Sequence, residues 1–529
     1  MLPRAHVLHL ASRVGLLAWP VIITNLLQSL VNVADLAMVG RLGPIEIAAV
    51  GMGSAVRMLI LVVILAVTTG SMALAAQARG AGDTSELQTV ARQSMLLALA
   101  VAVVLTAVGL LAAGPVLGFL NHGGDPRATA LGRDYLMLIF SGTVFLVTNV
   151  TVNALMQGAG DTLTPMLITT GVNVANVALS LVLIFGLGPV PALGVVGAAL
   201  GTVMARALGS AAGVWILASG RTRVAFGRGS WRPELARLAS LLRVGVPSGV
   251  QGLVRNSAQI LVLRIVTSTA AGSHGAAALA VGLQVESLAF MPGLAISVAA
   301  TSLVGRAVGR WDAADARRQG TAATGLAVAV MSLLAAALAA LAPVLVRAFD
   351  PSAHPVVLDA GISYLRINAL SHPLLAVAMV VNGALRGAGD TRPGMVGTIL
   401  GRWVTVVPLA WLLAHPLGLG VQGVWWALVA GTAVSAAWVA LRWRGEGWLA
   451  VARRTSALWQ QHLRHLPPDE AARFLDQVKG PVMALPDARE HLAAHGVTYA
   501  TAEGEVRVRF EPRPRIVEGE ELLARARGA

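Results

Sequence analysis

Two carboxylates stand out because each falls inside a long apolar stretch of the sequence. Asp35 lies about 20 residues into the stretch 14–38, and Glu286 lies about 10 residues into the stretch 276–304. A carboxylate in hydrocarbon is costly unless it is protonated or paired with a cation. At a rise of about 1.5 Å per helical residue, Glu286 would lie near the midplane of a bilayer and Asp35 in its outer half. Both are therefore candidates for binding protons or other cations.

Each of these acids also has an alternative explanation. Gln28, Asn32 and Asp35 are spaced at i, i+4 and i+7, which places them on one face of a helix. This face either lines an ion or substrate site, or it belongs to a helix end at which the lipid headgroups solvate Asp35. Glu286 is either a second protonation or cation site or one half of a structural ion pair.

Arginines supply the candidate partners for Glu286. Arg57 and Arg255 each lie about 11 residues from the start of their apolar stretches, near the expected midplane. We predict that Glu286 pairs with Arg255, because a short turn joins the two stretches that carry them, and Arg57 is the second choice. Arg264 and Arg402 lie nearer the ends of their stretches, and we expect both side chains to snorkel toward the headgroups.

Neutral polar side chains within the apolar stretches are further candidates for the site. Asn173, Asn176 and Ser180 occupy positions i, i+3 and i+7 of another apolar stretch and share a helical face. Such residues either form a site or make hydrogen bonds that pack helices together. Gln259 and Gln284 stand close in sequence to the midplane arginine and acid of the second half.

The sequence lacks the residue patterns of common enzymes and metal sites. It has no cysteine, its histidines have no metal-ligand spacing, and no Walker, nucleophile-elbow or His-Glu-X-X-His motif occurs. We therefore predict that the protein is not an enzyme, holds no metal site, and is not driven by ATP bound to this chain.

Composition indicates that membrane-spanning helices position these residues. Of the 529 residues, 56% are hydrophobic and only 12% are charged, whereas about a quarter of a soluble domain is charged. These values exclude a soluble enzyme, a disordered chain and a fibrous protein, and the continuous apolar stretches exclude an outer-membrane barrel. We predict an all-α membrane protein with twelve transmembrane helices. They are expected at 14–38, 46–76, 91–113, 134–157, 163–186, 192–217, 244–269, 276–304, 318–342, 360–384, 394–414 and 420–441.

The distribution of arginine sets the orientation of these helices. With twelve spans, twenty arginines lie on the side of the N-terminus, whereas the other side has only Arg41, Arg127, Arg133 and Arg347. Because basic loops stay in the cytoplasm, we predict a multi-pass protein of the plasma or inner membrane with both termini cytoplasmic. Topology accounts for the net charge of +14, so we expect no binding of nucleic acid.

The chain repeats itself after about 230 residues. The segment Gly158-Ala-Gly-Asp-Thr162 returns as Gly387-Ala-Gly-Asp-Thr391, and a proline and an apolar stretch follow each copy. Six spans per half give both halves the same orientation, and such parallel repeats typically flank a substrate path and rock against each other. The predicted organisation is an N-terminal lobe (1–217), a flexible cytoplasmic linker (218–243), a C-terminal lobe (244–441) and a cytoplasmic tail (442–529).

The tail has a different composition from the rest of the chain. Its pattern predicts a helix over 448–466, a break at Pro467-Pro468, a second helix over 469–478 and a strand over 505–510. It is either a regulatory or interaction module or a passive extension.

Several segments taken together resemble the multidrug and toxic compound extrusion (MATE) family of secondary transporters. They are Asp35-Leu-Ala-Met-Val-Gly-Arg-Leu-Gly43, Gly158-Ala-Gly-Asp-Thr162, Phe290-Met-Pro-Gly293 and Thr301-Ser-Leu-Val-Gly-Arg-Ala-Val-Gly309. They occur in order and at the repeat spacing, and the resemblance covers about residues 10–440. It implies two six-helix bundles that form a V around a central cavity, and the exchange of drugs for Na⁺ or H⁺.

The resemblance also implies roles for individual residues. Asp35 corresponds to an acid of the family's cation site in the N-terminal lobe, Asn176 to an asparagine of that site, and Glu286 to an acid on the eighth span of a bacterial subgroup. The chain departs from the family at Ser180, where many members have a second aspartate. It also lacks an acid on the seventh span, which reads Val254-Arg255-Asn256.

These observations define the candidate site. The cation-coupling candidates are Asp35, Asn176 and Glu286, and the substrate-cavity candidates are Gln28, Asn32, Arg57, Asn173, Ser180, Arg255, Gln259 and Gln284. We predict a monomeric secondary antiporter that exports amphipathic, cationic organic compounds in exchange for H⁺ or Na⁺, with no cofactor beyond that ion. The alternative is a flippase for a lipid-linked or anionic substrate, which the central arginines would bind.

Overall fold

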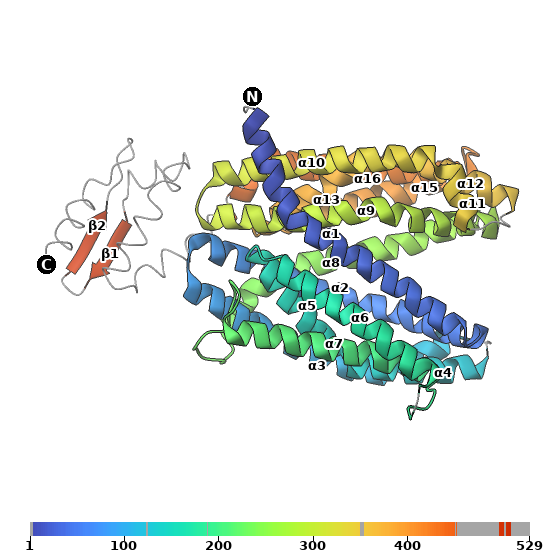
Figure 1. Cartoon of the computed structure of the whole chain (residues 1–529). Helices are drawn as coiled ribbons and strands as arrows, with labels where there is room; N and C mark the ends of the chain where they lie inside the picture. The colour runs from blue at the N-terminus through green and yellow to red at the C-terminus, as the bar shows by residue number, and fades with distance from the viewer. Residues whose placement is uncertain are drawn as a thin grey trace.

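Long helices account for nearly all of the chain that the structure describes (Figure 1). This computed structural model describes residues 4–122, 125–187, 189–349, 354–449, 451, 497–501 and 504–508. The first half contains α1 (Arg4–Gly40), α2 (Pro44–Ala81), α3 (Thr84–Leu120), α4 (Pro126–Ser141), α5 (Thr143–Gly158), α6 (Leu163–Phe185) and α7 (Gly194–Ser219). The second half contains α8 (Leu235–Thr267), α9 (Gly272–Gly309), α10 (Ala313–Ala340), α11 (Ala342–Phe349), α12 (Pro355–Ala369), α13 (His372–Gly387), α14 (Arg392–Thr398), the π-helical η1 (Ile399–Val406), α15 (Val407–Ala414) and α16 (Gly420–Arg444).

The described helices support eleven of the twelve predicted membrane crossings by length and composition. Nine are single apolar spans, and two more crossings are the pairs α4–α5 and α12–α13, which are bent by 48° and 55°. The predicted spans 134–157 and 360–384 are therefore each broken once. The remaining predicted span is α8, which is long enough but carries four arginines and is more polar than the others. The prediction of an all-α membrane protein is confirmed.

The helices form two groups, with two helices running between them. Figure 1 shows α2–α7 together, here called the N-lobe, and α9–α16 together, here called the C-lobe, while α1 and α8 run obliquely between the lobes. The first half of α1 packs on the C-lobe, where Val14 and Ala18 join Ala299 in one apolar cluster, and its last turns lie against α6. Helix α8 contacts the lobes in the opposite order along its length. Its first half packs on the N-lobe, where Gly245 abuts Ala66 of α2, and its final turns pack within the C-lobe.

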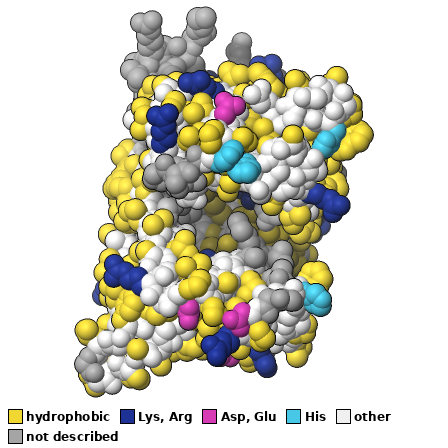
Figure 2. Space-filling view, turned by 90° about the vertical axis from the view of Figure 1, so that its right-hand side faces the viewer, with side chains coloured by type: hydrophobic (Ala, Val, Ile, Leu, Met, Phe, Trp, Pro, Cys, Tyr) yellow, Lys and Arg dark blue, Asp and Glu magenta, His cyan; other side chains and the backbone are white. Residues whose placement is uncertain are grey.

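The two lobes touch at one end of the molecule, here called the closed end. Gln77 of α2 donates a hydrogen bond to the carbonyl of Gly387 at 2.9 Å, and Ser302 of α9 donates one to the carbonyl of Gly158 at 3.0 Å. At the opposite end, here called the open end, the surface is hollowed between the lobes (Figure 2). The molecule is therefore sealed at one end only.

The lobes repeat the same packing at positions about 230 residues apart. The ring of Tyr135 in α4 covers the bare backbone of Gly53 in α2, and the ring of Tyr364 in α12 covers Gly282 in α9. A Cβ added at Gly53 would lie 2.7 Å from the Cδ1 atom of Tyr135, which no side chain tolerates without movement. The bends in α4–α5 and α12–α13 also correspond. The predicted internal repeat is thus present as paired three-dimensional contacts.

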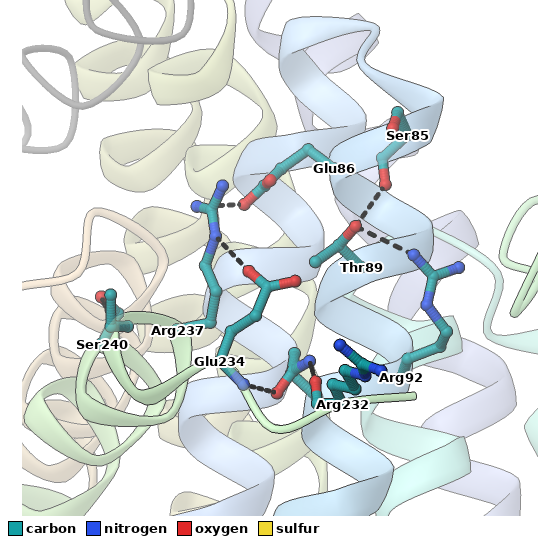
Figure 3. A network of polar contacts seen from close by, with 10 residues as sticks. Ser85, Glu86, Thr89, Arg92, Arg232, Glu234, Arg237 and Ser240 are labelled. Atoms are coloured by element: carbon teal, nitrogen blue, oxygen red, sulfur yellow. Dashed lines mark hydrogen bonds and ion pairs between the residues drawn. The ribbon is translucent and has the colours of Figure 1, made fainter. Parts of the chain in front are cut away.

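The predicted linker 218–243 is helical at both ends, and its remaining part is attached to the N-lobe. Because α8 already begins at Leu235, only 220–234 lies outside the helices. Figure 3 shows Arg237 between Glu86 of α3 and Glu234. An Nη atom of Arg237 lies 2.7 Å from the Glu86 carboxylate, and its Nε atom lies 3.8 Å from the Glu234 carboxylate. Arg92 and Gln93 of α3 also donate hydrogen bonds to linker carbonyls, and the backbone nitrogen of Glu234 donates one to the side-chain oxygen of Gln93. The linker is therefore fastened to α3 rather than free between the lobes.

Most of the predicted tail elements lie outside the described residues. This holds for the helix over 469–478 and for nearly all of the helix over 448–466. The strand predicted over 505–510 is confirmed in its described part, since β2 (Gly504–Val508) pairs in antiparallel fashion with β1 (Val497–Thr501).

Candidate functional site

The N-lobe side of α1 brings three of the predicted residues together around one carboxylate. The Nδ2 atom of Asn176 in α6 lies 3.4 Å from Oδ2 of Asp35, a long hydrogen bond, and the Ser180 hydroxyl donates to Oδ1 of Asn176 at 2.9 Å. The second carboxylate oxygen of Asp35 is buried and has no hydrogen-bond partner among the described residues. The arrangement therefore ends on an acceptor that is available to a proton or another cation.

Close packing of α6 against its neighbours holds this arrangement in place. Asn173, Asn176 and Ser180 are all buried, as their common helical face predicts. A Cβ on Gly201 of α7 would lie 2.7 Å from the Ser180 hydroxyl, so the glycine leaves room for it. Asn173 keeps its Nδ2 atom buried without a partner among the described residues. The predicted face is confirmed, and the packing shows that it meets α1.

Two arginines and a tyrosine surround Asp35. Arg57 of α2, Arg206 of α7 and Tyr135 of α4 all interact electrostatically with its carboxylate. The sequence analysis missed Arg206, although a single charge inside the apolar stretch 192–217 was a signal for it. The polar centre of the N-lobe therefore contains one carboxylate and two guanidinium groups.

Glu286 of the C-lobe has a different partner from the predicted one. Its carboxylate accepts a hydrogen bond from the hydroxyl of Tyr364, and Arg402 lies close enough to interact with both groups. The predicted pairing with Arg255 or Arg57 is wrong, because within the described ranges no ion pair joins Glu286 to an arginine. The acid is held by a neutral donor instead.

A π-helical segment brings Arg402 into the lobe. Arg402 lies in η1, where the hydroxyl of Thr405 donates to the carbonyl of Leu400 at 2.9 Å across the widened turn. The prediction that Arg402 snorkels toward the headgroups is wrong, because its guanidinium lies among protein atoms beside Glu286 and Tyr364. Single π-helical turns inside α-helices are rare and occur often at functional sites.

Two further arginines continue this polar centre. Arg255 of α8 lies close enough to Arg402 for their like charges to repel each other, and the same holds for Arg386 of α13 and Arg255. One Nη atom of Arg386 donates to the Ser297 hydroxyl at 2.8 Å, while its Nε atom is buried without a partner in the described structure. Of these three arginines, only Arg402 interacts with Glu286.

The remaining predicted cavity residues make fewer contacts. Gln28 and Asn32 are both accessible on α1, and the Gln28 amide lies 3.4 Å from Oδ1 of Asn32. Gln259 is half-buried and Gln284 is exposed, and neither side chain makes a hydrogen bond to another residue that the structure describes. The backbone carbonyl of Gln284 accepts a hydrogen bond from the Ser287 hydroxyl at 2.6 Å. Only the position of these four side chains along their helices therefore relates them to the polar centres.

A second hollow lies away from both polar centres. It is a groove of about 630 Å³ between the start of α1 and α10, and Arg317 and Arg318 stand beside it. Its other lining residues are mostly apolar, and it contains none of the predicted site residues. The recess between the lobes (Figure 2) is therefore the candidate path.

The repeated Gly-Ala-Gly-Asp-Thr segments use their aspartates differently at the closed end. Asp161 accepts hydrogen bonds from the backbone nitrogen and the hydroxyl of Thr164, at 3.0 and 2.7 Å, and so caps α6. Asp390 instead lies 3.5 Å from Arg442 of α16. Burial raises the pKa of Asp390, although Arg442 and Arg392 act in the opposite direction.

Comparison with known sequences covers most of the helical part. The model of the MatE family matches residues 20–182 and 247–412, one stretch in each half. The probable multidrug resistance protein NorM of Bradyrhizobium diazoefficiens is 32% identical over 441 residues, which is 81% of this chain and 92% of that protein. The probable multidrug resistance protein NorM of Thermotoga maritima is 30% identical over 432 residues, which is 81% of this chain and 91% of that protein.

Solved structures show the same architecture. A MOP superfamily transporter from Pyrococcus furiosus, described as having a binding pocket of reverse polarity, aligns with a TM-score of 0.77 at 27% identity, over 84% of this chain and 96% of that chain. An outward-facing multidrug resistance transporter of the MATE family aligns with a TM-score of 0.76 at 28% identity, over 85% of this chain and 96% of that chain. In both cases the similarity spans most of the two chains.

Proposed function

The chain belongs to the MatE family of transporters, and we propose that it is a proton-driven antiporter that exports amphipathic organic compounds from the cell. An antiporter needs a group that binds the driving ion in the interior of the membrane part. The contacts of Asp35 with Asn176, and of Asn176 with Ser180, supply such a group, and they are the observation that supports the proposal. The multidrug resistance relatives support export as the direction of transport.

The make-up of the N-lobe centre favours H⁺ over Na⁺ as the driving ion. A proton needs one carboxylate oxygen, and Asp35 offers a buried oxygen without a partner among the described residues. Na⁺ needs several oxygen ligands at once, and Arg57 and Arg206 beside the carboxylate oppose a metal cation.

The closed end is proposed to face the cytoplasm. The loops at this end carry most of the arginines, whereas the loops of the open end carry few. Basic loops are retained on the cytoplasmic side, so both termini are cytoplasmic in a plasma or inner membrane. The recess in Figure 2 then opens to the outside, and the structure is outward-facing.

Helix α1 provides a route from the proton to the conformational change. Its first half packs on the C-lobe through Val14 and Ala18, whereas Asp35 near its other end contacts α6 of the N-lobe. Protonation of Asp35 changes its hydrogen bond with Asn176 and therefore the packing of α6 against α1. A proton can drive the exchange only through its different affinity for the two states of the transporter. Both polar centres are built from one chain, so we propose that a monomer suffices, with no cofactor beyond the driving ion.

Transport into and out of proteoliposomes tests this function. The probes are dansylglycine, an anion, and a dansyl quaternary amine, a cation with the same fluorophore. We expect an imposed pH gradient to drive efflux of at least one probe, and a Na⁺ gradient at constant pH to drive none. Asp35→Asn should abolish the driven efflux.

The matched control is Asp134→Asn, which changes an exposed aspartate of the same lobe and should transport normally. Full pH-driven efflux from folded Asp35→Asn protein would refute the role of Asp35. Efflux that needs Na⁺ and ignores the pH gradient would refute proton coupling.

A further inference from the structure

We propose that the groove between the start of α1 and α10 binds one phospholipid with a negatively charged headgroup. The lipid phosphate lies on Arg317 and Arg318, and an acyl chain fills the apolar part of the groove. The site faces the cytoplasmic leaflet, and only this choice of leaflet rests on the orientation given under the proposed function. Binding of the lipid itself does not depend on the transport function.

The shape of the groove is the first argument. Figure 1 shows the start of α1 crossing α10 obliquely, and the two helices contact each other. Ala314, Arg318, Thr321 and Gly325 are all exposed and are spaced at i, i+4, i+7 and i+11, so they share the outward face of α10. A Cβ added to Gly325 meets open space. Small residues beside the crossing therefore leave a hollow of about 630 Å³.

The place of the groove is the second argument, because it lies on the bilayer side of the closed end. Helix α10 follows α9, whose last residue, Gly309, packs against the backbone of Gln77 at the closed end. The opposite face of α10 is buried in the C-lobe, where Ala323 joins an apolar cluster. From Arg318 to Leu326 the α10 wall of the groove runs about 12 Å, at about 1.5 Å per residue. One leaflet of the hydrocarbon core is about 15 Å deep, so this wall matches an acyl chain.

The two arginines are the third argument. Arg317 and Arg318 both line the groove, and neither side chain has a hydrogen bond or an ion pair to another residue that the structure describes. The nearby Asp315 is already paired with Arg310 at 2.8 Å. The Cζ atom of Arg317 lies 6.0 Å from the centre of the Trp448 ring, a cation–π contact that leaves its N–H donors free. The rim of the groove therefore offers two guanidinium groups to a ligand.

The chemistry of the rim and of the walls selects the ligand. Guanidinium groups bind phosphate oxygens through paired hydrogen bonds. Basic pockets between membrane helices on the cytoplasmic side are typical sites for anionic lipid headgroups. A zwitterionic headgroup would bring a cation next to the two arginines, whereas an anionic headgroup does not. A free phosphate cannot cover the apolar walls at Leu10 and Leu326, so a lipid fits the whole groove.

Native mass spectrometry of the full-length protein, released from detergent micelles, measures this binding directly. The protein is titrated with phosphatidylglycerol, which is anionic, and with phosphatidylcholine, which is zwitterionic. We expect the first phosphatidylglycerol to bind about ten-fold or more tightly than the first phosphatidylcholine, since one charged hydrogen bond is worth about that factor. Excess glycerol phosphate, which has the phosphate and no acyl chain, should not displace the lipid.

A double variant tests the charged rim. Arg317→Gln with Arg318→Gln should weaken phosphatidylglycerol binding about ten-fold or more and leave phosphatidylcholine binding unchanged. The matched control is Arg228→Gln with Arg232→Gln, which removes two exposed arginines of the linker. Phosphatidylglycerol should also raise the melting temperature of the native protein and not that of the rim variant, because a ligand that binds only the folded state stabilises it.

A single variant tests the apolar part of the groove. Gly325→Phe should weaken phosphatidylglycerol binding although both arginines remain, because the added ring occupies the space of the acyl chain. Gly118→Phe in α3 is the control, since a Cβ at Gly118 also meets open space. Elution volume and circular dichroism confirm that each variant is folded.

Each contrary outcome overturns the inference. Equal binding of the two phospholipids does so, and so does unchanged phosphatidylglycerol binding in either folded variant. Displacement by glycerol phosphate would show that the site binds phosphate alone rather than a lipid. Absence of any retained phospholipid would mean that a protein segment fills the groove. None of these measurements involves transport, so they succeed or fail independently of the proposed antiport.

Discussion

The N-lobe and the C-lobe share one packing frame and carry different polar groups on it. In each lobe a tyrosine ring covers a glycine of the neighbouring helix, as Tyr135 covers Gly53 and Tyr364 covers Gly282. In the N-lobe centre the acid comes from α1 and meets an asparagine. In the C-lobe the acid is Glu286 of α9, and the tyrosine itself donates to it.

This difference suggests a division of labour between the lobes. Asp35 has a buried oxygen without a partner in the described structure, so it can take up a proton. Glu286 already accepts a hydrogen bond from Tyr364 and lies beside Arg402, so it is engaged by the protein. The contacts that hold the lobes in shape recur in both halves, whereas the polar side chains between them differ. Under the proposed function, the N-lobe carries the ion-coupling carboxylate.

The largest expected effect separates the two acids. Asp35→Asn should abolish pH-driven efflux in proteoliposomes, because it removes the one carboxylate of the N-lobe centre among the described residues. Glu286→Gln should keep much of the driven efflux, because the amide oxygen still accepts the hydrogen bond of Tyr364. An equally complete loss in a folded Glu286→Gln protein would erase the distinction between the lobes.

The shared frame is tested at its two glycines. Gly53→Ala and Gly282→Ala each place a methyl group against a tyrosine ring, and each should lower the free energy of unfolding by about 1–3 kcal/mol. Thermal melting in detergent measures the change, and Gly51→Ala, where a Cβ meets open space, is the control. A loss at only one of the two sites would mean that the lobes are not packed equivalently.

The two tyrosine hydroxyls should differ in importance. Tyr364→Phe leaves the carboxylate of Glu286 without its donor and should cost about 1–3 kcal/mol of stability. Tyr135→Phe should cost less, because its hydroxyl makes no hydrogen bond to another described residue. A double-mutant cycle with Glu286→Gln measures the coupling at the C-lobe site. An absent coupling energy would show that the hydrogen bond does not contribute.

The smallest expected effect concerns the aspartate of the C-lobe repeat at the closed end. The pKa of Asp390 is raised by burial above the ordinary value of 3.8. A group with a raised folded pKa stabilises the fold below its unfolded pKa, and this contribution is lost as the pH rises through the folded pKa. The melting temperature of the native protein relative to Asp390→Asn should therefore fall as the pH rises above about 4. A constant difference across this range would contradict the raised pKa.

The sequence by itself determined the membrane-spanning class, the repeat and one of the two polar centres. Continuous apolar stretches leave no other way to satisfy the backbone than helices in a bilayer. The spacing of Asn173, Asn176 and Ser180 fixed their common face, because helical periodicity depends only on the chain itself. Asp35 was found because a lone carboxylate in an apolar stretch is costly wherever that helix packs.

Only the tertiary structure decided which residues meet. Helical spacing places a side chain on a face of its own helix, but the helix that this face contacts depends on packing between distant segments. The prediction for Glu286 failed for this reason, since its partner Tyr364 comes from α12, which is not adjacent to α9 in the sequence. The prediction for Arg402 failed because its position follows from a π-helical segment, which regular α-helical spacing does not predict. The packing of η1 against α8, where the Trp403 indole donates to the carbonyl of Val254 at 3.1 Å, is likewise a property of the folded lobe rather than of any one stretch of sequence.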